Sequence, residues 1–248
     1  MAKSLVRSWP EAADIVTTAL WPGGITIVLP RSSVVPDAVT GGGDTVAIRC
    51  PAHPVALALI RAVGEPIAAP SANRHRHVSP TTAAHVMRSL GDVASLALIL
   101  DGGPCREGLE STVLDLSMPE PEIARPGAVP VEVLRRLLGT VTYEPRYALS
   151  GVRPSPGQDP VHYAPNARVR VAPLAEIERV LARQPSEHVV AITRQTLRPP
   201  GGRGVSAMAL GFEAGAFAQG LYAAFYEAEG LGATEIWVEA PPDTSDWD

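Results

Sequence analysis

The C-terminal third of the chain alternates between two apolar patterns, and this alternation constrains the fold more than any other feature. Runs rich in β-branched residues at 169–171, 189–193 and 235–239 indicate strands, and helical patterns at 174–183 and 213–229 separate them. A strand that reaches the next strand through a helix pairs with it in parallel, by a right-handed crossover. Residues 168–248 are therefore predicted to form a small Rossmann-like parallel α/β domain.

The N-terminal part has a similar mixture of patterns with more turns. Strands are predicted at 25–29, 45–49, 67–69, 96–100 and 112–116, and helices at 54–64 and 131–138. A further helix is predicted to begin with Ser79 as its N-cap and Pro80 in its first turn, and to end at Gly91. We expect an α/β domain over 1–141, with a twisted mixed sheet and helices. A proline-rich linker over 142–167 would connect it to the second domain.

Composition indicates an ordinary globular protein. Hydrophobic residues make up 46% of the 248 residues and charged residues 19%. No apolar run is long enough to span a bilayer, and the first ten residues lack the apolar segment of a signal peptide. Cys50 and Cys105 form no metal-type pair and suggest no disulfide framework. These features predict a cytoplasmic protein with no membrane association.

The charge distribution limits the choice of partner. Residues 1–170 carry 16 basic and 15 acidic side chains, and residues 171–248 carry 5 and 11. Neither part is basic enough for strong unaided binding to nucleic acid. Lys3 is the only lysine among the 21 basic residues, so recognition of phosphate or carboxylate groups must rely on arginine.

The stretch from Pro66 to Pro80 is the strongest candidate for a binding site. A short apolar segment ends at Pro70, and the small polar residues Ser71, Asn73 and Ser79 follow it. Small side chains after a strand let backbone N–H groups approach a ligand, and ligands of α/β folds bind at such strand ends. This loop suits a nucleotide phosphate or an amino-acid carboxylate.

Three other segments place polar groups at the ends of elements, namely 45–49, 108–112 and 125–127. Together with the loop after Pro66 they could line one cleft for a polyanion and a zwitterion, such as a nucleotide and an amino acid. The sequence has no Walker A loop, no dinucleotide fingerprint and no nucleophile elbow. Catalysis by positioning and charge stabilisation is therefore predicted, with no catalytic side chain and no metal ligand assigned.

A series of motifs, in order along the chain, resembles the threonylcarbamoyl-AMP synthase family of YrdC-like proteins, in its long form with an extra C-terminal domain. The motifs are Trp-Pro-Gly-Gly at 21–24, Thr-Val-Ala-Ile-Arg at 45–49, Ala-Pro-Ser-Ala-Asn at 69–73, Ser-Pro-Thr-Thr at 79–82, Glu-Ser-Thr-Val at 110–113, Arg-Pro-Gly at 125–127 and His-Tyr-Ala-Pro at 162–165. The resemblance implies a nucleotidyltransferase that makes threonylcarbamoyl-adenylate from L-threonine, bicarbonate and ATP, with release of pyrophosphate. ATP would enter as a substrate with Mg²⁺. A transferase complex would then pass the group to tRNA.

The resemblance also implies roles for individual residues. Arg49, the backbone at Ala69, and Ser111 match positions that hold threonine. ATP would be held by residues matching its surroundings in the family: Thr45, Ser71, Ser79, Arg125 and Tyr163, the last of which closes over the nucleotide. Asn73 is a weaker candidate in the same loop.

Two differences from the family pattern concern the ends of the chain. The family begins with an additional segment that carries a Lys/Arg-rich triphosphate grip, and it continues into a final helix. Relative to that pattern the chain resembles a member trimmed at both ends, and we expect weak ATP binding and weak or absent turnover from it.

Two other functions remain open at this point. An RNA-binding YrdC-like module without catalytic activity would use Arg74 and Arg76, although the near-neutral charge of 1–170 argues against it. A carbamoyl-transfer enzyme that carries a YrdC-like module is the third, although the linker with His-Tyr-Ala-Pro argues against it.

Overall fold

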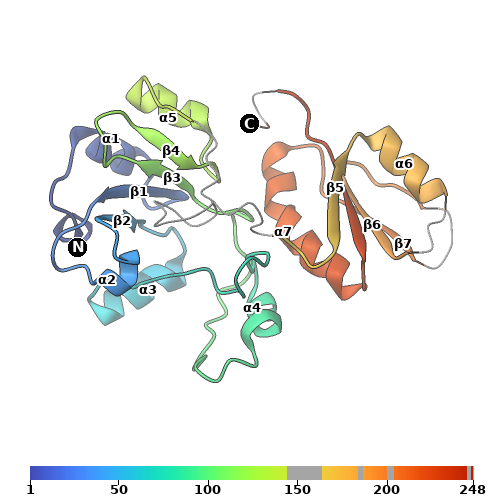
Figure 1. Cartoon of the computed structure of the whole chain (residues 1–248), viewed down its shortest axis with the longest axis horizontal. Coiled ribbons are helices and arrows are strands. Elements are labelled where there is room, and N and C mark those ends of the chain that lie inside the picture. The colour runs from blue at the N-terminus through green and yellow to red at the C-terminus, as the bar shows by residue number, and fades with distance from the viewer. Residues whose placement is uncertain (144–163, 184–186, 200–203, 245–246, 248) are drawn as a thin grey trace. The chain divides into compact units, whose positions relative to one another are not determined.

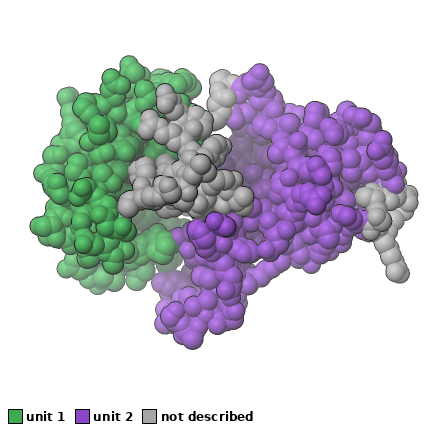
Figure 2. Space-filling model, viewed as in Figure 1, with its two compact units in different colours: residues 1–70, 110–160 green, residues 71–109, 161–248 purple. Residues whose placement is uncertain are grey.

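A computed structural model describes residues 1–143, 164–183, 187–199, 204–244 and 247 (Figure 1). The chain divides into two compact units. The first comprises Met1–Pro70 and Glu110–Pro160, and the second comprises Ser71–Leu109 and Val161–Asp248 (Figure 2).

The first unit is built on a four-stranded mixed sheet of order β2-β1-β3-β4. Strand β1 pairs with β2 in antiparallel and with β3 in parallel orientation, and β4 pairs antiparallel with β3. Its elements are η1 (Ala2–Leu5), α1 (Glu11–Leu20), β1 (Ile25–Pro30), α2 (Asp37–Thr40), β2 (Thr45–Ile48), α3 (Pro54–Val63), β3 (Thr112–Asp115), β4 (Glu122–Arg125) and α5 (Val131–Leu138).

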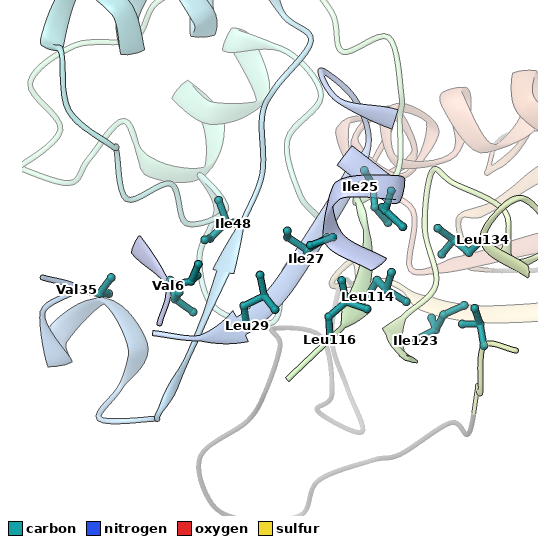
Figure 3. Packing of buried hydrophobic residues seen from close by; sticks show 14 residues of the cluster. Val6, Ile25, Ile27, Leu29, Val35, Ile48, Leu114, Leu116, Ile123 and Leu134 are labelled. Carbon is teal, nitrogen blue, oxygen red and sulfur yellow. The ribbon is translucent and has the colours of Figure 1, made fainter. Parts of the chain in front are cut away.

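Side chains alternate along the strands of this sheet between a hydrophobic face and a second face. Ile25, Ile27 and Leu29 of β1 are fully buried in one cluster with Val16 of α1 and Leu134 of α5. Figure 3 shows this cluster, in which Ile48, Leu114 and Ile123 continue the same face across the neighbouring strands. Because successive side chains of a strand point to opposite faces, Thr26 and Val28 belong to the other face.

The second unit contains an all-parallel sheet of order β5-β8-β6-β7. Helices α6 and α7 pack against different residues of this sheet: Val189 and Ala191 of β6 cluster with α6, whereas Val190 and Ile192 cluster with α7. Strands buried by helices on both faces are typical of parallel sheets. The elements are α4 (Ala83–Leu90), β5 (Arg168–Ala172), α6 (Leu174–Ala182), β6 (Val189–Thr193), β7 (Val205–Ala209), α7 (Ala214–Gly230) and β8 (Glu235–Glu239).

These two sheets confirm the predicted fold class, a mixed α/β sheet followed by a parallel α/β sheet. The domain boundaries at 141 and 168 stay a prediction. Among the described residues, no helix has the length and apolarity needed to cross a bilayer.

Some local predictions are wrong. Residues 67–69 and 96–100 form no strand, because neither segment pairs with another among the described residues. Strands β4 and β7 were not predicted, because their sequences are short and weakly apolar. Helix α4 begins at Ala83 and not after Ser79, since the side chain of Thr82 accepts the N–H of His85 at 3.2 Å and forms the cap.

Candidate functional site

Polar residues of three strands lie in one row across the second face of the first sheet. Thr26 of β1 pairs with Val113 of β3, and Val113 pairs with Arg125 of β4. Arg49 directly follows Ile48, which pairs with Ile27, so the antiparallel register places Arg49 opposite Thr26. Residues in one cross-strand row project to the same face of a sheet. The register therefore brings Arg49, Thr26 and Arg125 to one face.

A β-bulge explains why Arg125 lies on this face. Ile123 pairs with Leu114 and belongs to the hydrophobic cluster, and simple alternation would direct Arg125 to the same side. The register shifts between Val113 and Leu114, so Ala124 is the extra residue of β4. One extra residue reverses the facing of the residues that follow it. The bulge thus moves the guanidinium of Arg125 from the core side to the polar side.

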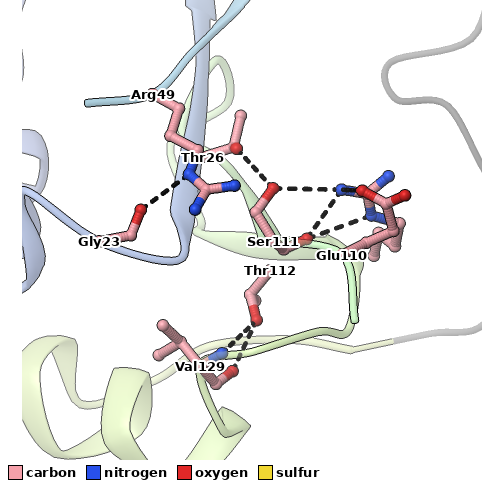
Figure 4. Close-up of polar contacts among 8 residues, drawn as sticks. Gly23, Thr26, Arg49, Glu110, Ser111, Thr112 and Val129 are labelled. Atoms are coloured by element: carbon pink, nitrogen blue, oxygen red, sulfur yellow. Dashed lines mark hydrogen bonds and ion pairs between the residues drawn. The ribbon is translucent and has the colours of Figure 1, made fainter. Parts of the chain in front are cut away.

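Ser111, just before β3, connects this row through hydrogen bonds (Figure 4). Its hydroxyl lies 2.8 Å from the hydroxyl of Thr26, and both residues are buried. The Nε and Nη2 atoms of Arg125 both donate to the Ser111 carbonyl oxygen, at 3.2 and 2.8 Å, and Nη2 also lies 3.2 Å from the Ser111 hydroxyl. Glu110 lies 3.7 Å from Nη2 of Arg125. Two predicted site residues, Ser111 and Arg125, are therefore in direct contact.

Arg49 is held at the start of β1 by the turn that precedes this strand. Its Nε donates to the carbonyl oxygen of Gly23 at 2.8 Å, and the N–H of Gly23 donates to the carbonyl of Cys50 at 2.9 Å. The Arg49 residue is exposed. The turn at 21–24 therefore orients the guanidinium of Arg49 at the end of β2.

The Arg-Pro-Gly turn after β4 has a packing reason for its glycine. A Cβ atom on Gly127 would lie 2.6 Å from the Ser111 carbonyl carbon and 2.7 Å from the Thr112 nitrogen. The next residue, Ala128, donates its N–H to the Glu110 carbonyl at 2.9 Å. The Thr112 hydroxyl both donates to the Val129 carbonyl and accepts the Val129 N–H, at 2.7 and 2.9 Å. The turn after β4 is thereby fixed against the backbone of 110–112.

The other predicted site residues lie at several places. Thr45 is the first residue of β2, half-buried, and by alternation shares the face of Arg49. Ala69 is exposed in the irregular segment that ends the first part of unit 1, and Ser71 is exposed at the start of unit 2. Ser79 is buried within unit 2. Tyr163 lies outside the described residues.

Sequence reasoning missed Thr26 and Glu110 as parts of the site. Thr26 is the only polar residue in the apolar run Ile-Thr-Ile-Val-Leu of β1, and it is 8% exposed. A lone hydroxyl at a buried strand position needs a hydrogen-bond partner, and this signal could have identified it. Glu110 gave no such signal, because its proximity to Arg125 depends on the turn at 125–127.

The polar loop of unit 2 is folded on its own side chains. The Asn73 side-chain amide donates to the carbonyls of Arg74 and His77, both at 2.9 Å. Nη2 of Arg74 lies 2.6 Å from both carboxylate oxygens of Asp92. A cavity of about 140 Å³ beside this loop is lined by Arg74, His77, Val78, Arg88, Ser89, Asn166, Tyr226 and Glu229. This volume is below the roughly 300 Å³ that is typical of the smallest ligand pockets.

Among the described residues, no three His, Cys, Asp or Glu side chains gather at a distance that suits one ion. We therefore assign no protein ligand to Mg²⁺ and derive no step through it.

Comparison with known proteins gives the family. The Sua5/YciO/YrdC family model, described as telomere recombination, matches residues 1–127. The model described as the C-terminal domain of threonylcarbamoyl-AMP synthase matches residues 129–248. The chain belongs to the Sua5/YciO/YrdC family.

Individual relatives agree with this assignment. A threonylcarbamoyl-AMP synthase of Pyrococcus abyssi is 44% identical over 169 residues, which cover 67% of this chain and 49% of the relative. One of Bacillus subtilis is 42% identical over 164 residues, covering 65% of this chain and 47% of the relative. The crystal structure of P. abyssi Sua5 complexed with L-threonine superposes with a TM-score of 0.88 at 34% identity, covering 98% of this chain and 72% of that one. The chain matches about half the length of these two curated relatives.

Proposed function

We propose that the chain carries the threonylcarbamoyl-AMP synthase activity of its family. L-threonine, bicarbonate and ATP would be converted to threonylcarbamoyl-adenylate and pyrophosphate. The observation that supports this most is the row of Arg49, Thr26 and Arg125 on one face of the first sheet, joined by Ser111. The similar structure that contains L-threonine and the relatives named as synthases support the same reading.

In this proposal Arg49 and Ser111 hold the amino acid. The exposed guanidinium of Arg49 is directed by the Gly23 carbonyl and would receive the carboxylate of threonine, since a guanidinium fork matches a carboxylate. Ser111 is fixed by Thr26 on one side and by Arg125 on the other, so its hydroxyl is pre-oriented. The backbone at Ala69 would contribute further contacts to threonine.

The chemistry that such a site must support consists of two bond-forming steps. The threonine amine attacks the carbon of bicarbonate, and the resulting adduct loses water to give a carbamate. A carbamate oxygen then attacks the α-phosphate of ATP, and the bond to the β-phosphate breaks with release of pyrophosphate. Neither step needs a side-chain nucleophile, so positioning and stabilisation of negative charge would provide the catalysis.

The nucleotide would be held by the residues that match ATP positions of the family, namely Thr45, Ser71, Ser79, Arg125 and Tyr163. Arg125 supports this reading best, because its side chain is only 13% exposed and its guanidinium lies beside Ser111 and Glu110. A group so placed can stabilise the charge that develops between threonine and ATP. Mg²⁺ would accompany the nucleotide phosphates.

This activity makes the protein a nucleotidyltransferase of tRNA modification. Its product would be passed to tRNA by a transferase complex, and a cytoplasmic location follows from that partner. An RNA-binding module without catalysis is less well supported. Arg74, one of the two arginines that would contact RNA, is paired with the Asp92 carboxylate.

Pyrophosphate release tests the proposal directly. Release should require both threonine and bicarbonate, and Arg49→Ala should lower it at least tenfold at subsaturating threonine. Arg61→Ala, at an exposed position near the end of α3, is the matched control and should leave the rate unchanged. Pyrophosphate release that does not depend on threonine would reject the proposed activity.

A further inference from the structure

Tyr226 of α7 contacts the segment that carries Ser71 and Ser79. Its hydroxyl donates to the carbonyl oxygen of Val78 at 2.9 Å. Its ring stacks on His85 of α4, with centroids 4.0 Å apart and planes 5° from parallel. The Val78 residue is only 3% exposed and packs in the same hydrophobic cluster as Tyr226. Helix α7 therefore fixes the backbone immediately before Ser79.

The same turn of α7 contacts two further segments. Arg88 of α4 binds to it, and its own Glu229 binds Asn166. Nη1 of Arg88 donates to the Tyr226 carbonyl at 2.7 Å, and its Nη2 lies 3.8 Å from Glu229. The Glu229 carboxylate accepts the backbone N–H of Asn166 at 2.6 Å and its side-chain amide at 3.0 Å. Asn166 follows the His-Tyr-Ala-Pro motif. One turn of α7 thus joins the loop, α4 and the last residues of the linker.

The loop itself has a backbone conformation that needs external support. Arg76 has φ 69°, a left-handed conformation that residues other than glycine rarely adopt. Its carbonyl accepts the N–H of Ala164 at 3.1 Å. Strained residues of this kind persist where the surrounding structure fixes them, and they cluster at ligand sites. The contacts to Ala164 and Tyr226 provide such fixation on either side of His77.

A second contact joins Gly108 and Leu109, at the end of segment 71–109, to α7. A Cβ atom on Gly108 would overlap the backbone of Gln219, and Leu109 packs on the α7 cluster. The segment 71–109 is therefore fastened to α7 at both ends, although the family model that contains it extends over 1–127. The contacts make α7 a support for the loop in addition to a helix of the parallel sheet.

We propose that Tyr226 is a positioning residue for nucleotide binding: its hydrogen bond to Val78 and its stacking on His85 fix the conformation of loop 71–79, which carries Ser71 and Ser79. This inference rests on the proposed nucleotide role of those two serines. It assigns to the C-terminal domain a part in substrate binding, carried out through α7.

The test compares Tyr226→Phe with Tyr222→Phe in the full chain. Phenylalanine at 226 retains the stacking on His85 and removes the hydroxyl, which is bonded to the Val78 carbonyl and also hydrogen-bonds with Ser89. Tyr222 is a buried tyrosine of the same helix and cluster, so its substitution is the same chemical change without the bond to Val78. The readouts are hydrogen–deuterium exchange of a peptide covering 73–82, ATP affinity by calorimetry, and KM and kcat for ATP and threonine.

Tyr226→Phe is expected to speed exchange of the loop peptide and to weaken ATP affinity about fivefold, as the loss of one hydrogen bond does. KM for ATP should rise while kcat changes less than twofold and KM for threonine is unchanged. Loop exchange equal to that of Tyr222→Phe would overturn the anchoring. Faster loop exchange with unchanged ATP affinity would overturn the link to nucleotide binding. If the unmodified chain binds no ATP, the proposed function fails, whereas loop exchange still decides whether Tyr226 anchors the loop.

Discussion

At the scale of single residues, the buried pair of hydroxyls formed by Thr26 and Ser111 joins stability to binding. Both residues are less than 10% exposed, and their oxygens are 2.8 Å apart. A buried polar group that loses its partner costs about 1–3 kcal/mol, whereas removal of both partners is close to neutral. Substitutions at this pair can therefore separate an effect on the stability of the fold from an effect on substrate binding.

Ser111→Ala should lower the free energy of unfolding by about 1–2 kcal/mol, because the Thr26 hydroxyl loses its partner. Adding Thr26→Val should restore most of this stability, since no buried hydroxyl then lacks a partner. Threonine affinity should stay low in both variants, because both lack the Ser111 hydroxyl. Urea unfolding and calorimetry measure the two effects. Recovery of threonine affinity in the double variant would show that Ser111 acts only through stability.

Residue identity alone did not predict this pair. The sequence predicted that Arg49, Ser71, Ser111 and Arg125 line one cleft, from motifs that lie far apart along the chain. The register and hydrogen bonds bring Arg49, Ser111 and Arg125 to one face. Ser71 belongs to the other compact unit, so its part in this cleft stays a prediction. Thr26 was missed because a β-strand run such as Ile-Thr-Ile-Val-Leu is also typical of an ordinary edge position, where a threonine needs no partner.

At the scale of elements, the turn after β4 decides where Arg125 lies. The bulge at Ala124 moves Arg125 to the polar face, and Gly127 lets the turn pack against the backbone of 110–112. The sequence placed Arg-Pro-Gly at the end of an element but did not predict β4 or its bulge, because bulges depend on pairing with a partner strand that local patterns do not specify.

Gly127→Ala should destabilise the first unit by about 1–3 kcal/mol, because the added methyl group has no space beside Ser111 and Thr112. It should also weaken threonine binding, as the fork of Arg125 on the Ser111 carbonyl depends on this turn. Gly215→Ala is the matched control, since nothing lies within 4 Å of a Cβ there. The control should be neutral or stabilising by up to about 1 kcal/mol. Equal unfolding free energies for the two variants would contradict the packing role of Gly127.

The contact between α4 and α7 should depend on pH through His85. Burial lowers the pKa of His85 below its ordinary value of 6.5, and the charge of Arg88 lowers it further. The imidazole Nδ1 lies 3.3 Å from the Thr81 N–H, which needs an unprotonated acceptor. The unfolded chain therefore takes up the proton more readily than the folded chain, so this contribution to stability is complete above pH 6.5 and declines as the pH falls toward the folded pKa.

Thermal unfolding between pH 7.5 and 5.5 should show this loss of stability. In His85→Phe the decline should be smaller, because phenylalanine keeps the stacking on Tyr226 and carries no titrating group. His53→Phe, at the N-cap of α3, serves as the comparison at a position outside this contact. A decline of the same size in His85→Phe and the unmodified chain would exclude His85 as its source.

At the scale of the whole molecule, the two compact units do not follow the division seen in the sequence. The sequence places 71–109 between segments of the N-terminal domain, and the family model covers them together over 1–127. In the structure Ser71–Leu109 belongs to the same compact unit as Val161–Asp248. Local patterns predicted both sheets, because periodicity is a local property. They did not predict that Val78, His85 and Arg88 contact Tyr226, about 140 positions away in the chain.

We propose that one face of the first sheet holds threonine between Arg49 and Ser111. A crystal structure of this chain with L-threonine would test this placement. We expect the carboxylate of threonine within hydrogen-bond distance of the Arg49 guanidinium, with the Ser111 hydroxyl in contact with the same molecule. Threonine bound on the opposite face of this sheet, or away from both residues, would contradict it.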